Sequence, residues 1–206
     1  MPFYFPLNGV DLDIENKLEK PNFDLEKEYF VYVARVEEWK RQNFLVDALI
    51  KLNNKGIVIP KTYIVGRLID KRFVKEMKGK IKLNNLESKI IFTGSVKSKV
   101  AHYFLKNSKL SFSLYHTSNL GNVFLEGLRM GVPFICINDT NSLDLISKES
   151  FIEVKKSCID EVSEKIEMIL KDNTVLKKYS KKAKEFSDGN ISSWEKRAKM
   201  ELDLIL

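Results

Sequence analysis

The chain has 206 residues, of which 44% are hydrophobic, so it can bury one sizeable core or two small ones. No run approaches the roughly 18 apolar residues that a membrane-spanning helix requires. The first residues carry acids where a secretory signal needs a basic segment and then an apolar one. Cys136 and Cys158 stand alone, without the spacing of metal ligands, so we expect both to be reduced. These features predict a cytoplasmic protein.

The formal net charge is +7, from 35 lysine and arginine residues against 28 aspartate and glutamate residues. The densest basic run, LKKYSKKAKEF at 176–186, keeps apolar residues at helical spacing, which is typical of the solvated face of an amphipathic helix. No zinc spacing, helix-turn-helix pattern or aromatic sheet motif accompanies the charge, so we expect no nucleic-acid partner. Two uses of the charge stay open, namely peripheral contact with anionic lipid or an acidic glycan, and solubility.

Apolar, β-branched runs alternate with helical patterns along most of the chain. Residues 1–27 hold few apolar runs, and Asn8-Gly9 favours a turn, so this stretch is interpreted as a lead-in or linker remnant. The apolar runs predict strands over 29–34, 62–65, 89–92, 110–114, 134–137 and 151–154. The helical patterns predict helices over 42–52, 71–84, 96–105, 122–130, 143–146, 159–171, 174–187 and 191–205.

This alternation indicates βαβ units and an α/β fold. Right-handed crossovers then give a single Rossmann-like domain over 28–190, with a parallel sheet flanked by helices on both faces. Residues 191–206 add a terminal helix that places Trp194, Ala198 and Leu202 on one face. In such a sheet ligands bind beyond the carboxyl ends of the strands. The loops after residues 34, 65, 92 and 114 are therefore the candidate site.

The segment SNLGNVFLEGLRMGVP at 118–133 is the most informative of these loops. Small residues open directly into an apolar helix, so unpaired backbone N–H groups and a positive dipole end would face a phosphate. Glu126, one turn further on, offers only acceptors, which suits the hydroxyls of a ribose. An ordinary β–α–β corner explains the same residues equally well when this segment is taken alone.

Cations follow the first strand. Arg35 and Lys40 are five residues apart and could clamp a diphosphate, although two exposed cations would look the same. His116 follows the fourth strand beside the glycine loop and is a candidate donor contact, whereas His102 lies in a helical pattern and is interpreted as structural.

The ordered series NGVD, ARVEEWK, IVGR, IIFTG and SNLGNVFLEGLRMGVP resembles the carboxyl-terminal half of group 1 (family 4) retaining glycosyltransferases of the GT-B fold. The resemblance runs from about Asn8 to the end of the chain. It implies that the chain binds a nucleotide-sugar donor, UDP- or GDP-linked, and needs no further cofactor and no metal.

The resemblance also assigns roles by position. Arg35 and Lys40 would neutralise the donor diphosphate, and Glu126 would accept hydrogen bonds from the ribose. The backbone N–H groups that would cradle the diphosphate are those of Leu120, Gly121, Asn122 and Val123. The sugar-contact positions are Ser118 and Asn119. The residues near the nucleobase would be Gly66, Phe92, Thr93 and Gly94.

Three positions depart from the family pattern. Ser118 stands where the first glutamate of the Glu-x7-Glu motif is expected, Arg41 where a glycine follows the lysine, and Leu68 where the VGxG turn has its second glycine. The family's active site lies between two Rossmann-like halves, and this chain resembles only the donor half. The resemblance therefore implies an acceptor-binding amino-terminal domain or separate subunit, on which the 191–206 helix would pack.

By the same resemblance, the chain would be a hexosyltransferase half that is inactive alone, working in surface-glycan or glycolipid synthesis at the inner face of the membrane. The alternative is a non-catalytic nucleotide-sugar-binding subunit that pairs with a separate acceptor-binding chain.

Overall fold

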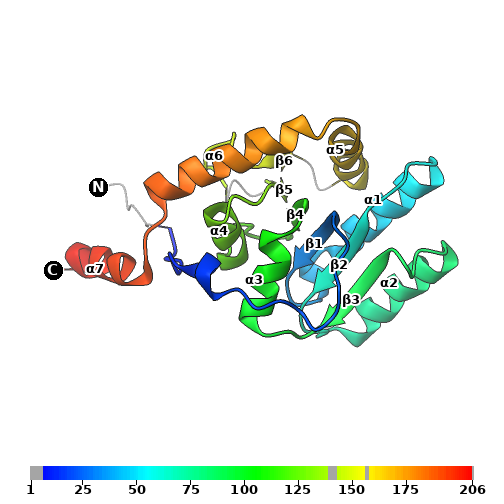
Figure 1. Ribbon diagram of the computed structural model, residues 1–206, viewed down its shortest axis with the longest axis horizontal. Coiled ribbons are helices and arrows are strands. Elements are labelled where there is room, and N and C mark those ends of the chain that lie inside the picture. The colour runs from blue at the N-terminus through cyan, green and yellow to red at the C-terminus, as the bar shows by residue number, and fades with distance from the viewer. Residues whose placement is uncertain (1–6, 139–142, 156–157, 206) are drawn as a thin grey trace.

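Six short apolar strands form one parallel sheet, seen edge-on at the centre of Figure 1. The computed structural model describes residues 7–138, 143–155 and 158–205. The strands are β1 (Tyr29–Val33), β2 (Lys61–Val65), β3 (Ile90–Gly94), β4 (Leu110–Ser113), β5 (Phe134–Ile137) and β6 (Ile152–Val154). Their order across the sheet is β3-β2-β1-β4-β5-β6. The predicted α/β fold with a parallel sheet is confirmed.

Helices cover both faces of the sheet. One face carries α1 (Gln42–Asn54), α2 (Lys71–Leu83) and α5 (Ile159–Lys171), and the other carries α3 (Ser98–Lys106) and α4 (Asn122–Arg129). The long helix α6 (Thr174–Asn190) passes from the first core, where it places Leu176, to the second, where it places Ala183. α7 (Trp194–Ile205) then follows, and two 3-10 turns, η1 (Ile14–Lys17) and η2 (Glu38–Lys40), complete the described elements.

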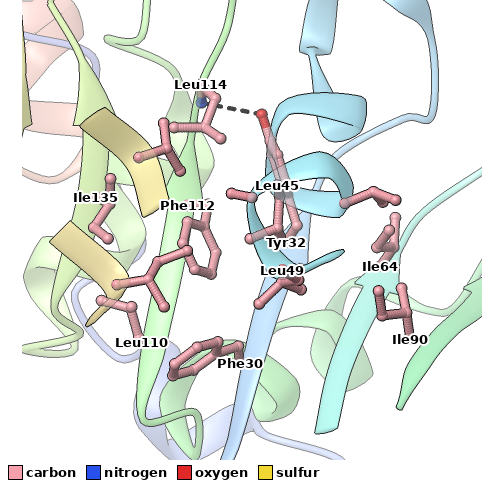
Figure 2. Packing of buried hydrophobic residues seen from close by; sticks show 14 of the residues in the cluster. Phe30, Tyr32, Leu45, Leu49, Ile64, Ile90, Leu110, Phe112, Leu114 and Ile135 are labelled. Atoms are coloured by element: carbon pink, nitrogen blue, oxygen red, sulfur yellow. Dashed lines mark hydrogen bonds between the residues drawn. The ribbon is translucent and has the colours of Figure 1, made fainter. Parts of the chain in front are cut away.

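β1 shows why these runs become strands. Side chains alternate across a pleated strand, so Phe30 and Tyr32 enter the core under α1 while Tyr29, Val31 and Val33 enter the core under α3 and α4. All five residues are buried, as expected for a strand covered on both faces. Figure 2 shows the first of these cores, where Phe30 and Tyr32 meet the strand and helix residues labelled around them.

The predicted helix over 143–146 is wrong, because the chain forms a turn there. One backbone bond closes it, from the Ile146 N–H to the Leu143 carbonyl at 2.9 Å. The side chain of Asn138 accepts the Leu143 N–H at 3.2 Å, and this bond holds the start of the turn. The three-residue apolar spacing of Leu143 and Ile146 therefore reflects a buried turn.

The first described residues pack against the segment before α7, at one end of the domain (Figure 1). The Val10 N–H donates to the Ser192 carbonyl at 3.0 Å. A Cβ on Gly9 would lie 2.6 Å from the Trp194 Cα, so this close approach requires glycine. On α7 itself, Trp194 and Leu202 are 49% and 58% exposed. No described helix combines the length and the apolar character needed to cross a bilayer.

Candidate functional site

The strand order places the candidate site between β1 and β4. The chain leaves β1 toward β2 on one side and leaves β4 toward β5 on the other, so the two loops diverge at their carboxyl ends. A crevice at such a reversal is where open parallel sheets bind ligands. The loop after β1 spans 34–41 and the loop after β4 spans 114–121.

Hydrogen bonds tie these two loops together. The buried Tyr32 hydroxyl accepts the Leu114 N–H at 3.0 Å, the dashed bond in Figure 2, and donates to the Lys40 carbonyl. The His116 N–H donates to the Trp39 carbonyl at 2.9 Å. Because the Tyr32 hydroxyl bonds to one residue of each loop and the His116–Trp39 bond joins the loops directly, the two loops have a fixed relative position.

The start of α4 presents unpaired backbone donors. Gly121 is its N-cap and supplies no capping side chain. Within the described chain, the N–H groups of Gly121, Asn122 and Val123 make no hydrogen bond, whereas the Leu120 N–H donates to the Ser118 hydroxyl at 3.2 Å. Three N–H groups and the positive end of the helix dipole therefore face this edge of the sheet.

Ser118 and Asn119, the predicted sugar contacts, differ in exposure. The Asn119 side chain is buried, where its Oδ1 accepts from the Tyr115 N–H at 2.8 Å and its Nδ2 donates to the Ile137 carbonyl at 2.7 Å. Asn119 thus fastens the loop to β5. Ser118 is exposed and is the side chain of this pair that solvent reaches.

The two predicted phosphate cations lie at the end of β1. The Lys40 ammonium rests between two aromatic rings, 3.4 Å from the Tyr115 centroid and 3.7 Å from the Trp39 centroid. Burial lowers the pKa of Lys40 to about 8, because it disfavours the charged form. Arg35 is 60% exposed and forms an ion pair with Glu37, Nε to Oε1 at 3.1 Å.

Arg41 occupies the position where the family pattern has glycine, and its backbone is left-handed, with φ 51° and ψ 36°. Few residues other than glycine adopt this region, which disfavours a Cβ. Its guanidinium contacts Nδ1 of His116. Since a guanidinium only donates hydrogen bonds, Nδ1 is the acceptor in this contact.

A hollow of about 450 Å³ opens beside this pair. It is lined by Glu38, Trp39, Arg41, Asn43, Phe44 and His116. In the described parts of the chain, no group of three or more His, Cys, Asp or Glu side chains is placed to hold a metal ion. Cys136, buried in β5, and Cys158, at the start of α5, are both free thiols.

Glu126 lies one turn into α4 and contacts a residue that no sequence pattern places beside it. Its Oε2 is 3.1 Å from Nε2 of His102 on α3. Both side chains are mostly buried, with exposed fractions of 21% for Glu126 and 18% for His102. The lead-in also reaches this helix, because the Asn8 amide donates to the Asn122 side chain at 2.9 Å.

The predicted nucleobase residues lie at the ends of β2 and β3. The Gly66 N–H donates to the Gly94 carbonyl at 3.1 Å, and a Cβ on Gly66 would lie 2.0 Å from the Ala34 carbonyl oxygen. The Phe92 ring packs toward α2, with the Lys78 ammonium 5.6 Å from its centroid. β3 is three strand spacings from β4, about 14 Å, which an extended nucleoside diphosphate can bridge.

Comparison with known proteins identifies the family. The family model for group 1 glycosyl transferases matches residues 13–186. No curated protein sequence is significantly similar to the chain. Among solved structures, a glycosyltransferase from Rickettsia africae aligns with a TM-score of 0.80 and 18% identity over 96% of this chain and 55% of that protein. Anabaena Alr3699/HepE, solved with UDP and glucose, aligns with a TM-score of 0.73 and 16% identity over 85% of this chain and 47% of its own.

A third structure contains one domain only. The carboxyl-terminal domain of the group 1 protein LpcC from Francisella tularensis aligns with a TM-score of 0.70 and 17% identity, over 90% of this chain and 94% of that one. The chain thus spans about half the length of the full-length structures that it matches. The expected resemblance to the donor-binding half of a GT-B enzyme is confirmed, and the chain belongs to the group 1 glycosyl transferase family.

Proposed function

We propose that this chain is the nucleotide-sugar-binding half of a retaining glycosyltransferase. The observation that carries the proposal is the arrangement at the β1–β4 reversal. There, three unpaired N–H groups at the start of α4 share one edge of the sheet with Arg35 and Lys40, and Glu126 lies one turn further into the helix. This combination matches the parts of a ribonucleoside diphosphate, with donors and cations for the phosphates and a carboxylate for the ribose.

The reaction would break the bond between the anomeric carbon and the diphosphate, and form one from that carbon to an acceptor hydroxyl with the configuration kept. Negative charge develops on the departing diphosphate. Fixed N–H dipoles at Gly121, Asn122 and Val123, with the cations Arg35 and Lys40, would stabilise that charge. The donor would be a UDP- or GDP-sugar, and the UDP bound by the Anabaena protein favours the former. We propose Ser118 as the side chain nearest the sugar, and the turns at Gly66 and at Phe92, Thr93 and Gly94 as the nucleobase end.

The acceptor would be held by a second half, either an amino-terminal domain or a separate subunit. The exposed Trp194 and Leu202 of α7 suit a helix that packs on such a partner. We place the reaction in surface-glycan or glycolipid synthesis at the cytoplasmic face of the membrane, where a net charge of +7 favours contact with anionic lipid.

Calorimetry with UDP, GDP and ADP tests the proposal. We expect Arg35→Ala and Lys40→Ala each to weaken binding of the preferred nucleoside diphosphate by roughly 1.5–3 kcal/mol, the range for charge-assisted hydrogen bonds. The bare nucleoside should bind both variants and the wild type equally. Equal losses for nucleoside and diphosphate would show a damaged fold instead. Preference for an oligonucleotide over all three diphosphates would reject the assignment.

The exposed Ser118 favours a second candidate, a non-catalytic nucleotide-sugar-binding subunit, because the family pattern has a carboxylate there. The two candidates differ when the chain is combined with its acceptor-binding half. Sugar transfer by the combination supports the transferase, whereas nucleotide-sugar binding without product supports the subunit.

A further inference from the structure

We propose that His102 is a positioning residue for the nucleotide: it holds the Glu126 carboxylate so that one oxygen stays directed to the ribose. This inference rests on the proposed function, because it takes Glu126 as the ribose ligand. His102 comes from α3, the helix after β3, and not from any of the loops that form the candidate site.

The contact has the geometry of a charge-assisted hydrogen bond. Nε2 of His102 lies 3.1 Å from Oε2 of Glu126. A carboxylate accepts hydrogen bonds only, so Nε2 carries the shared proton. This bond holds one of the two carboxylate oxygens and thereby orients the group.

The other oxygen is left for a ligand. Within the described chain, Oε1 of Glu126 receives no hydrogen bond, yet the side chain keeps 21% of its surface exposed. An acceptor that is fixed in direction and open on one side suits a ribose hydroxyl. Without the imidazole, the Glu126 side chain would be free to turn about its own bonds, and that freedom would be lost again on binding.

Holding α3 on α4 does not require this pair. Phe104 and Leu105 of α3 share a buried core with Leu125 and Leu128 of α4. A separate polar bond joins the same helices, from the Lys106 ammonium to the Met130 carbonyl at 3.0 Å. Buried polar pairs also contribute less to stability than apolar contacts of similar volume. The His102–Glu126 contact therefore has a use other than adhesion, and Lys106 provides the matched control.

The experiment measures the preference for ribose hydroxyls. Calorimetry compares UDP, and in parallel GDP, with the 2′,3′-dideoxy form of each nucleotide. For whichever of UDP and GDP binds more tightly, the wild type should bind the ribonucleotide with an affinity roughly tenfold or more above that of its dideoxy form. This difference is the size of one charge-assisted hydrogen bond. Glu126→Gln should abolish most of this preference. His102→Leu should reduce it to about twofold, His102→Gln should restore it because its amide can donate to Oε2, and Lys106→Ala should leave it unchanged.

A second measurement does not depend on the leucine variant folding. The chain has two histidines, so the His102 ring signals in an NMR spectrum are assigned by their loss in His102→Gln. The chemical shifts of these signals should change when the nucleotide binds the wild type, and should not change when it binds Glu126→Gln.

The possible failures are distinguishable. If no nucleoside diphosphate binds, or if Glu126→Gln keeps the full preference for ribose, the proposed function fails at its ribose contact. If Glu126→Gln loses the preference while His102→Leu keeps it, the donor site stands and the role of His102 is rejected. A fall in thermal stability for His102→Leu with an unchanged preference would likewise show a structural contact only.

Discussion

Tyr32→Phe should separate the two loops of the candidate site without changing any residue that would touch the ligand. The substitution removes one buried oxygen, which accepts the Leu114 N–H at 3.0 Å and donates to the Lys40 carbonyl. Neither backbone group has another partner among the described residues. Burial raises the pKa of Tyr32 well above its usual range, so the hydroxyl keeps its proton and remains a donor at any ordinary pH.

The expected loss of stability follows from the two groups left unpaired. A buried donor or acceptor without a partner costs about 1–3 kcal/mol. Leu114 is fully buried, so we take about 2 kcal/mol for its N–H. Lys40 is partly exposed, so water can reach its carbonyl, and we take about 1 kcal/mol there. The sum is about 3 kcal/mol, which lowers Tm by roughly 6–12 °C for a domain of this size.

Two other buried tyrosines provide a graded control in urea denaturation. The Tyr29 hydroxyl donates one hydrogen bond, to the Phe104 carbonyl at 2.8 Å, and the Tyr63 hydroxyl makes none with the described residues. Tyr63→Phe should be nearly neutral, Tyr29→Phe should lose about 1 kcal/mol and Tyr32→Phe the most. Tyr32→Phe should also weaken nucleoside diphosphate binding more than nucleoside binding, because Lys40 loses its anchor. If Tyr32→Phe loses no more stability than Tyr63→Phe, the Tyr32 hydroxyl does not hold the two loops together.

Three further predictions concern the cations and the catalytic competence of the chain. Because the Lys40 pKa is about 8, the affinity for the diphosphate should fall between pH 7 and 9.5 in the wild type and much less in Lys40→Arg. The stability of the free protein should rise with pH from 8 toward 10.5, because the unfolded chain binds more protons in this range. A wild-type affinity that does not change with pH would contradict this prediction. Arg41→Gly should be more stable than Arg41→Ala by about 1 kcal/mol, since both lose the guanidinium but only alanine keeps the strain of φ 51°; equal urea midpoints would show that no strain is present. The purified chain alone should bind the nucleotide-sugar without transferring it, because orienting the acceptor supplies much of the rate; sustained turnover in a radiolabel assay would overturn this.

The fold was predictable because short, mostly apolar runs alternate with helical patterns along the chain. A run such as YFVYV at β1 has no polar side to confuse with a helix, and the helices between strands show clear apolar spacing. The failure at 143–146 has a local cause. Buried leucine and isoleucine three residues apart look the same in a turn and in a helix, so their spacing does not decide between the two.

Part of the candidate site was predictable for a different reason. Its loops follow the carboxyl ends of consecutive strands, and that position depends only on strand order. The contacts of His102 and Tyr32 depend on how separate elements meet. His102 and Glu126 lie on different helices, and Tyr32 bonds to residues on two loops, so no spacing in the sequence signals either contact. The same holds for the buried Asn119, whose partners on β5 appear only when the sheet has formed.

Two of the departures from the family pattern, Arg41 and Ser118, lie on the two loops that the His116–Trp39 hydrogen bond joins. Arg41 and Ser118 lie on different loops, yet Arg41 contacts His116, two residues before Ser118. The His116 N–H also bonds to the Trp39 carbonyl on the loop that carries Arg41, so this bond joins the two loops. The parts that would bind diphosphate and ribose, namely the N–H groups of α4 and Glu126, keep the family pattern. Arg41 and Ser118 therefore lie on the two loops near the position proposed for the sugar, whereas the third departure, Leu68, follows β2. We therefore propose that Arg41, His116 and Ser118, rather than the groups that would bind the nucleotide, decide which sugar is accepted.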